Sequence, residues 1–163
     1  MKVHQVMSHS IVSVSPSTSF KELWKIIFQK KVNSIPVVDV KKKLLGIISK
    51  EDLLRQLYPD FGEFINDFES SSDFEAMEKK VKELVGLTAK DIMGKRFIFT
   101  RHDTFVMRAL SRMIARSVNQ LPVLDQGDRL VGMITKGDIF YALFRGQLSD
   151  DSPSMKSRKK KTS

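Results

Sequence analysis

One seven-residue phrase occurs twice in this chain. GIISKED stands at residues 46–52, and GMITKGD stands at residues 132–138. The offset of 86 residues holds without a gap over about fifty positions, which indicates one internal duplication and not a long array. The duplication predicts two similar structural units. Identical residues at matching positions include Met7 and Met93, Asn33 and Asn119, Pro36 and Pro122, Gly46 and Gly132, Lys50 and Lys136, and Asp52 and Asp138.

Both copies carry the same order of hydrophobic patterns. A short extended run comes first, at 11–14 and 97–100, and apolar residues at helical spacing follow, at 20–28 and 106–114. Two apolar runs joined by a polar turn then predict a hairpin, and a second helix begins within each phrase. The order strand, helix, strand, strand, helix predicts a mixed α/β fold of the α+β class. A unit of about fifty residues is marginal alone, so we expect the two sheets to pack together and leave clefts between them.

The apolar faces of the helices predict which residues form the cores. Trp24 lies on the apolar stripe of the first helix, and we expect it to be buried. The helix after each phrase is expected to turn its apolar residues inward, namely Leu53, Leu54 and Leu57 in the first copy and Ile139, Phe140, Leu143 and Phe144 in the second.

The composition divides the chain into a first unit at 1–57, an insertion at 58–90, a second unit at 91–148 and a tail at 149–163. The insertion is acidic and carries two amphipathic patterns, which predict two helices. It lacks the spacing of a calcium loop, so we expect no metal site there. Residues 151–163 carry five basic residues and one acidic residue, contain nothing apolar after Met155, and are expected to be disordered.

Several classes of chemistry find no support in the sequence. The chain has no cysteine and no apolar run long enough to cross a membrane, so we expect neither disulfides nor a membrane span, and a cytoplasmic location. The three histidines, His4, His9 and His102, lack metal-ligand spacing, and neither a nucleophile elbow nor a P-loop is present. We therefore expect no catalytic residue, no metal, no required cofactor and no enzymatic activity.

Two explanations account for the hydroxyl and the carboxylate of the phrase, which are Ser49 with Asp52 and Thr135 with Asp138. Their spacing is that of a capping box, which satisfies backbone amides where a helix begins. The same pair, facing a cleft, could instead bind the two hydroxyls of a vicinal diol. Lys50 and Lys136, beside a helix N-terminus, favour a nearby anion. A diol beside an anion describes a ribose phosphate, and the extended runs could contact its base.

Both copies resemble CBS domains, and the chain is similar to a stand-alone CBS-domain pair, or Bateman module. The matching stretches are MSHSIVSVSP at 7–16, NSIPVVD at 33–39, GIISKEDLL at 46–54, DIM at 91–93, NQLPVLD at 119–125 and GMITKGDIF at 132–140. The resemblance implies a homodimer whose clefts bind adenosine-containing ligands such as AMP, ADP, ATP or S-adenosylmethionine. It also implies that the two hydroxyl–carboxylate pairs hold ribose, and that adenine lies among Ser10, Ile11 and Val12 in one cleft and Arg96, Phe97 and Ile98 in the other.

The chain departs from the family pattern on the phosphate side. Strongly phosphate-binding members carry Arg or His where this chain has Asn33 and Ser34 in the first copy and Asn119 and Gln120 in the second. Neutral side chains add no charge, which argues against tight triphosphate binding. Glu51 matches Gly137, and an extra carboxylate repels an anion. We therefore predict that the Thr135/Asp138 site binds adenine nucleotide more tightly than the Ser49/Asp52 site.

Three functions remain open at this point. The leading hypothesis is a regulatory module that binds an adenosine-containing ligand and transmits a conformational change to an effector protein not identified by the sequence. An alternative is a structural or dimerisation protein whose clefts stay empty and whose hydroxyl–carboxylate pairs only cap helices. The net charge of +9 and the basic tail leave weak nucleic-acid binding as a third and less favoured hypothesis.

Overall fold

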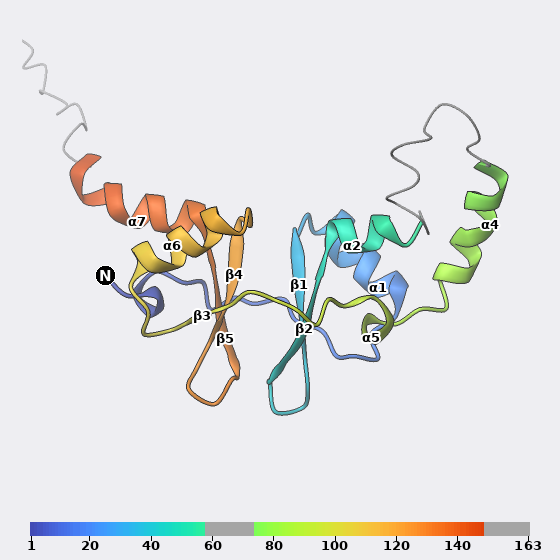
Figure 1. The fold of residues 1–163 in the computed structure, drawn as a ribbon, viewed down its shortest axis with the longest axis horizontal. Coiled ribbons are helices and arrows are strands. Elements are labelled where there is room, and N and C mark those ends of the chain that lie inside the picture. Colours follow the sequence, from blue (N-terminus) through green and yellow to red (C-terminus); the bar gives the residue numbers. More distant parts are fainter. Residues whose placement is uncertain (58–73, 149–163) are drawn as a thin grey trace, which may run out of the picture.

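Figure 1 shows two α/β units side by side, with the two hairpins near the centre and the helices on the outer flanks. The computed structural model describes residues 1–57 and 74–148. The helices and strands are η1 (Val3–Gln5), α1 (Phe20–Trp24), the π-helical turn η2 (Lys25–Gln29), β1 (Ser34–Val38), β2 (Leu44–Ser49), α2 (Lys50–Arg55), α4 (Phe74–Leu84), α5 (Ala89–Ile92), β3 (Thr100–Arg101), α6 (Val106–Ala115), β4 (Gln120–Leu124), β5 (Leu130–Thr135) and α7 (Lys136–Leu148). The mixed fold with two repeated units is therefore confirmed.

The two predicted hairpins form, and they match each other in detail. β1 pairs with β2 and β4 pairs with β5, both antiparallel, and each ladder has a register shift after its valine, at Val37 and at Val123. In each turn one residue adopts a left-handed conformation, Lys42 with φ 63° and Asp128 with φ 62°. The duplication in sequence is therefore also a duplication in backbone conformation.

The extended runs at 11–14 and 97–100 form less β-structure than expected. In the first copy Val14 alone makes a parallel bridge, to Val37. In the second copy the strand β3 covers only Thr100 and Arg101, which pair in parallel with β4. Backbone pairing is confined to the end of each run, and residues 96–98 line a cleft instead.

The segment that opens each copy crosses to the other unit. Near the N-terminus, the Val3 amide donates to the Thr104 carbonyl at 2.8 Å, and Ser8 exchanges backbone hydrogen bonds with Met133 at 2.8 and 3.0 Å. The matching segment of the second copy crosses to the first unit. The Ala89 amide donates to the Thr18 carbonyl at 2.9 Å.

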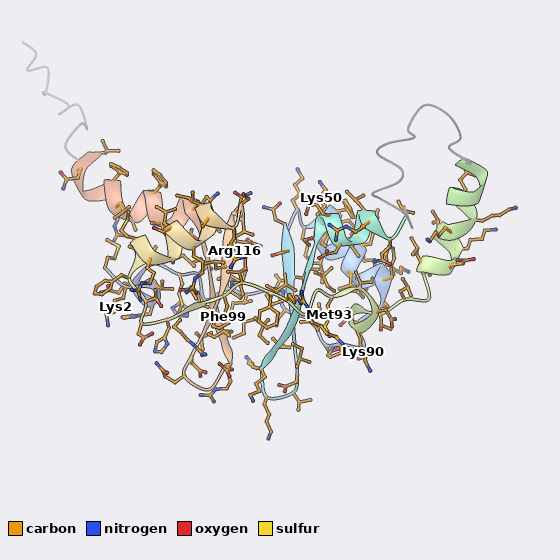
Figure 2. All side chains as sticks on the ribbon, in the orientation of Figure 1. Lys2, Lys50, Lys90, Met93, Phe99 and Arg116 are labelled. Atoms are coloured by element: carbon orange, nitrogen blue, oxygen red, sulfur yellow. The ribbon has the colours of Figure 1, made fainter. Side chains whose placement is uncertain are left out.

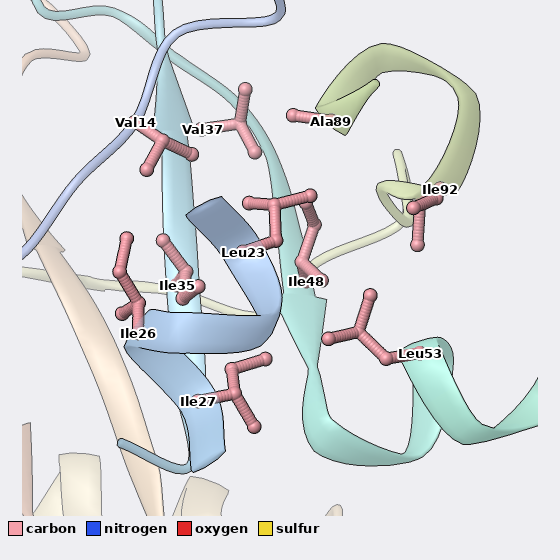
Figure 3. Packing of buried hydrophobic residues seen from close by; sticks show 10 residues of the cluster. All are labelled: Val14, Leu23, Ile26, Ile27, Ile35, Val37, Ile48, Leu53, Ala89 and Ile92. Atoms are coloured by element: carbon pink, nitrogen blue, oxygen red, sulfur yellow. The ribbon is translucent and has the colours of Figure 1, made fainter. Parts of the chain in front are cut away.

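Both hydrophobic cores therefore contain residues from the two copies. The first core is shown in Figure 3, where Ala89 and Ile92 of α5 close one side of the cluster. Its other members are Val14, Leu23, Ile26, Ile27, Ile35, Val37, Ile48 and Leu53. The second core contains the N-terminal Val3 together with Val106, Ala109, Leu110, Met113, Leu121, Val123, Ile134 and Ile139. Neither core is complete without the crossing segment.

The first glycine of each phrase makes room for one of these crossing segments. A Cβ at Gly46 would lie 2.8 Å from Sδ of Met93, and a Cβ at Gly132 would lie 2.5 Å from Sδ of Met7. Figure 2 shows Met93 beside β2, where the chain passes from α5 toward the second unit. The repeated methionine of each copy therefore packs against the repeated glycine of the other copy.

Several apolar residues expected in the cores are exposed. On α2 and α7 the buried residues are Leu53 and Ile139, whereas Leu54, Phe140 and Phe144 keep 43%, 53% and 48% of their surface exposed. Successive residues of a helix are about 100° apart around its axis, and on α2 and α7 the residue that follows the buried one turns away from the sheet. Trp24 follows the buried Leu23 and is 45% exposed for the same reason.

The insertion is described in part. α4 forms within the second of its two predicted helical segments, with Leu84 buried and Val81 exposed. The first segment and the tail lie outside the described residues. Within the described ranges, no helix combines the length and apolar character needed to cross a bilayer.

Candidate functional site

Both hydroxyl–carboxylate pairs form complete capping boxes. The Ser49 amide donates to Oδ2 of Asp52 at 2.7 Å, and the Asp52 amide donates to Oγ of Ser49 at 3.1 Å. In the second copy the corresponding distances between Thr135 and Asp138 are 2.9 and 3.0 Å. The structural role considered from the sequence is therefore realised at the first turn of α2 and of α7.

The caps leave part of each pair free for a ligand. Each box uses only Oδ2 of the aspartate and one lone pair of the hydroxyl, so the hydroxyl proton and Oδ1 stay outside the box. Oδ1 of Asp52 has only a long contact, 3.5 Å, with the Arg55 guanidinium. Over the described ranges, Oδ1 of Asp138 accepts no hydrogen bond. Capping and diol binding are therefore compatible in the same side chains.

A cleft of about 480 Å³ is lined by the predicted site residues around Ser49 and Asp52 and by the predicted adenine segment 96–98. It contains Ser49 and Asp52 from the first copy and the segment 96–98 from the second. The remaining predicted residues in its lining are Lys50, Asn33, Ser34, Asn119 and Gln120. The structure thus brings the predicted ribose pair, adenine segment and phosphate-side residues to one place.

The matching residues of the other set lie in different places. Asp138 lines a cavity of about 550 Å³ together with Gln5, Tyr141 and Arg145. Ile11 lines a small cavity of about 110 Å³ with His9 and Lys42. Ser10 and Val12 are exposed, and Nζ of Lys136 donates to Oδ1 of Asn119 at 3.4 Å. The ranking of the two sites made from the sequence therefore stays a prediction.

The charged residues that line the cleft balance one another. Lys50 and Arg96 are cations, and Glu51 and Asp52 are carboxylates. Nζ of Lys50 lies 5.6 Å from the centroid of the Phe28 ring, and Figure 2 shows Lys50 at the start of α2. A site with this balance favours a ligand of low net charge over a polyphosphate, because a polyphosphate would need an excess of cations.

Other residues of the cleft were not found from the sequence. Ser117 and Val118, which follow α6, line it, as does Gly94 of the crossing segment. A hydrogen bond from the Gln120 side chain to Oγ of Ser34 also joins the two copies at matching positions. The duplication places Gln120 opposite Ser34 in the alignment of the copies, but contact between them depends on how the units pack.

The fold and the site together define the class of protein. It is a protein of two βαββα units that share a cleft large enough for a nucleotide. The family model for the CBS domain matches residues 3–59 and again residues 89–145. The chain belongs to the CBS domain family, as a tandem pair.

Curated relatives include free-standing CBS proteins and enzymes that contain this pair. The chain is 29% identical over 138 residues to inosine-5′-monophosphate dehydrogenase of Methanocaldococcus jannaschii, across 85% of this chain and 23% of that protein. It is 29% identical over 136 residues to the chloroplastic CBS domain-containing protein CBSX2 of Arabidopsis thaliana, across 79% of this chain and 57% of that protein. The chain therefore spans about a quarter of the first relative and just over half of the second.

Solved structures show the same fold. The structure of CBSX2 in complex with AMP is 25% identical, with a TM-score of 0.69, and the match covers 90% of this chain and 98% of that chain. The CBS-domain pair of protein MJ0100, in complex with 5′-methylthioadenosine and S-adenosyl-L-methionine, is 22% identical with a TM-score of 0.61, across 88% of this chain and 99% of that chain.

Proposed function

We propose that this chain is a regulatory module that binds an adenosine-containing ligand in the cleft between its two CBS units. The observation that carries the proposal is the cleft of about 480 Å³ in which Ser49 and Asp52 meet the segment 96–98. Oδ1 of Asp52 and the hydroxyl of Ser49 supply an acceptor and a donor for the ribose diol. The AMP complex of CBSX2, which has this fold, supports the choice of ligand class.

The segment 96–98 supplies the wall for the base. Phe97 and Ile98 offer apolar surface, and the backbone between them carries the donors and acceptors that a purine edge requires. The 5′ substituent of the ligand then lies toward Asn119 and Gln120, which line the cleft on the side of the second unit. This placement favours a monophosphate or a thioether of adenosine over a triphosphate.

Ligand binding is expected to act on a partner through the relative position of the two units. The ligand contacts both copies, so it stabilises the arrangement in which the cleft closes on it. A ligand shifts such an equilibrium only by its difference in affinity for the two arrangements. We propose a homodimer as the form that transmits this shift to an effector protein.

Thermal denaturation with AMP, ADP, ATP and S-adenosylmethionine tests the proposal. A ligand at one hundred times its dissociation constant adds about 2.7 kcal/mol to the free energy of unfolding. Replacing Asp52 with Asn keeps an acceptor for the cap but removes the charge that binds the diol, so AMP affinity at this cleft should fall roughly ten- to a hundredfold. Asp103→Asn, an exposed aspartate outside the cleft, is the matched control. The proposal fails if no compound raises the unfolding temperature at millimolar concentration.

A structural role is the second candidate function, because both capping boxes are complete without a ligand. In that case Asp52→Asn would change the free energy of unfolding, and none of the compounds would raise the unfolding temperature of the wild type or of the variant. Crystals soaked in AMP would then show the carboxylates bound to the main chain and the cleft without ligand.

A further inference from the structure

The turns of the two hairpins have the same backbone and different side chains. In the turn between β1 and β2, Oδ1 of Asp39 accepts hydrogen bonds from the Lys41 and Lys43 amides at 2.8 and 2.9 Å. In the turn between β4 and β5, Oδ1 of Asp125 accepts them from the two matching amides at 2.8 and 3.0 Å. One aspartate holds each turn in the same shape, so that shape does not require the lysines of the first turn.

Lys42 occupies a position in the first turn that lysine seldom takes. Its φ of 63° lies in the left-handed region, which favours Gly, Asn and Asp and is costly for other residues. The matching residue of the second turn is Asp128, whose carboxylate accepts a hydrogen bond from Arg101 at 2.6 Å. Ser15 stands at the position that matches Arg101, and among the described residues no carboxylate pairs with the Lys42 ammonium. The first turn therefore carries a cation without a counter-charge from the described chain.

A small cavity lies beside Lys42. Its volume is about 110 Å³, which is enough for a few water molecules or for one group of the size of phosphate. Its polar lining residues are His9, Ser13 and Lys42, and within the described ranges their side chains make no hydrogen bond. The other described residues of the lining are apolar, namely Ile11, Val38 and Leu130. The cavity therefore offers hydrogen-bond donors and a positive charge, and its described lining contains no carboxylate.

The second copy has bulkier side chains at the corresponding positions. Phe97 and Phe99 match Ile11 and Ser13, and the centroids of the two rings lie 6.3 Å apart. The guanidinium carbon of Arg101 lies 5.1 Å from the centroid of the Phe99 ring. The first copy thus has smaller side chains and a cavity where the second copy has two rings and an internally paired arginine.

The cavity is separate from the adenosine cleft, and no described residue lines both. Figure 1 shows the two hairpin turns at the ends of the strands away from α2 and α7. The Leu130 amide donates to the Lys42 carbonyl at 2.9 Å, so the cavity lies where the two turns meet. An antiparallel bridge also places Lys43 opposite Arg129, which brings two like charges together. An anion at this junction would reduce that repulsion and contact both units.

We propose that this cavity binds a small oxyanion of the phosphate class. The Lys42 ammonium supplies the charge, and the side chains of Ser13 and His9 supply further donors. A phosphate group has acceptor oxygens in several directions, and its hydrogen bonds with an ammonium are stronger than those between neutral groups. The small volume admits a phosphate group and excludes a whole nucleotide. The inference goes beyond the proposed function and does not depend on it.

Nuclear magnetic resonance titration of the full chain with inorganic phosphate, at constant ionic strength, tests this site. We expect saturable shifts of the Ser13, Lys42 and Leu130 amide signals, and no saturable shift when chloride replaces phosphate. A parallel titration with phosphoethanolamine distinguishes free phosphate from the phosphate group of a lipid. Binding of both compounds would show that the cavity accepts a headgroup, and binding of phosphate alone would restrict the site to the free anion.

Three variants separate the cavity from the general charge of the turn. Lys42→Gln should weaken phosphate binding roughly tenfold to a hundredfold, because it removes a charged donor. Lys41→Gln is the matched control, since it removes the same charge from the same turn at a residue outside the lining, and it should change the affinity much less. Ser13→Phe introduces the residue of the second copy and keeps every lysine, and it should abolish binding by filling the cavity.

Several results would overturn the inference. Equal losses in Lys41→Gln and Lys42→Gln would mean that phosphate only screens the turn. Saturable binding that survives Ser13→Phe would place the anion outside the cavity, and shifts that grow linearly with phosphate would mean that no site exists. Adenosine responses should be the same in Lys42→Gln as in the wild type. Failure of every adenosine compound to bind would contradict the proposed function and leave this site standing.

Discussion

The contact between Gly132 and Met7 offers the sharpest test of the crossing segments. A Cβ added at Gly132 would lie 2.5 Å from Sδ and 3.0 Å from Cγ of Met7, and 3.1 Å from the Ser8 carbonyl oxygen. Met7 can move its flexible end, but the Ser8 carbonyl is backbone that accepts a hydrogen bond from Met133 at 3.0 Å. Gly132→Ala must therefore displace the N-terminal segment from β5 or distort the strand.

The expected loss is the difference between two opposing effects. Forcing a methyl group into a packed contact costs about 1–3 kcal/mol. Replacing glycine in a strand recovers about 0.5–1 kcal/mol of backbone conformational entropy. The net destabilisation is about 0–2.5 kcal/mol, which lowers the unfolding temperature of a chain of this size by up to about 10 °C.

Urea unfolding followed by circular dichroism measures the loss, and hydrogen exchange locates it. Protection of the Ser8 and Met133 amides should fall in Gly132→Ala, while that of the Gly94 and Ile47 amides should not. Gly146→Ala is the matched control because an added Cβ there meets nothing within 4 Å. This control lies within α7, where alanine should stabilise the chain by about 1 kcal/mol.

A double-mutant cycle completes the test. In Met7→Ala combined with Gly132→Ala the side-chain clash is gone, so the total loss should be smaller than the sum of the two single losses. Additive losses, or a Gly132→Ala variant as stable as Gly146→Ala, would refute the packing of the crossing segment against β5.

Two further predictions concern pH and assembly. The backbone amide of Arg129, which donates to the Asp125 carboxylate at 3.0 Å, lowers the pKa of that carboxyl below its usual value, with help from the Arg129 side chain and the Gly127 amide. Because the pKa of Asp125 is lower in the folded state, its carboxylate stabilises the fold above the unfolded-state pKa of about 4, and this stabilisation is lost as the pH falls below that value. The free energy of unfolding of Asp125→Asn, measured in urea, should therefore depend less on pH between about 5 and 3 than that of the wild type. Phe140 and Phe144 are exposed and stacked, with ring centroids 6.0 Å apart. If this surface forms the proposed homodimer, light scattering should show a dimer for the wild type and a monomer for the double serine variant, with little change in core stability. A wild-type monomer, or a variant that remains a dimer, would contradict this use of the α7 face.

Much of the fold is predictable because it depends on local rules. The two hairpins follow from alternating apolar runs on either side of a polar turn, and the helix starts at Lys50 and Lys136 follow from the capping residues before and after them. Burial within the helices was predicted less well. The apolar pattern of FKELW and GDIFYALF does not say which of two adjacent apolar residues faces the sheet, and Trp24 and Phe140 are exposed.

The candidate site was only partly readable in the sequence. Ser49, Asp52 and the segment 96–98 were assigned to a ligand from the phrase and from the family resemblance, and the structure places them in one cleft. The resemblance did not predict that Ser49 and Asp52 of the first copy share a cleft with residues 96–98 of the second copy. It also did not predict the hydrogen bond between Gln120 and Ser34.

The sequence by itself determined that the chain holds two like units with capped helices and paired hairpins, because hydrogen bonds between residues a few positions apart establish these features. Only the tertiary structure decided that residues 3–8 complete the second core and residues 89–94 the first, and that both copies contribute to one cleft. Those outcomes depend on contacts between residues that are tens of positions apart in the sequence, and no local pattern records the free energy of such contacts.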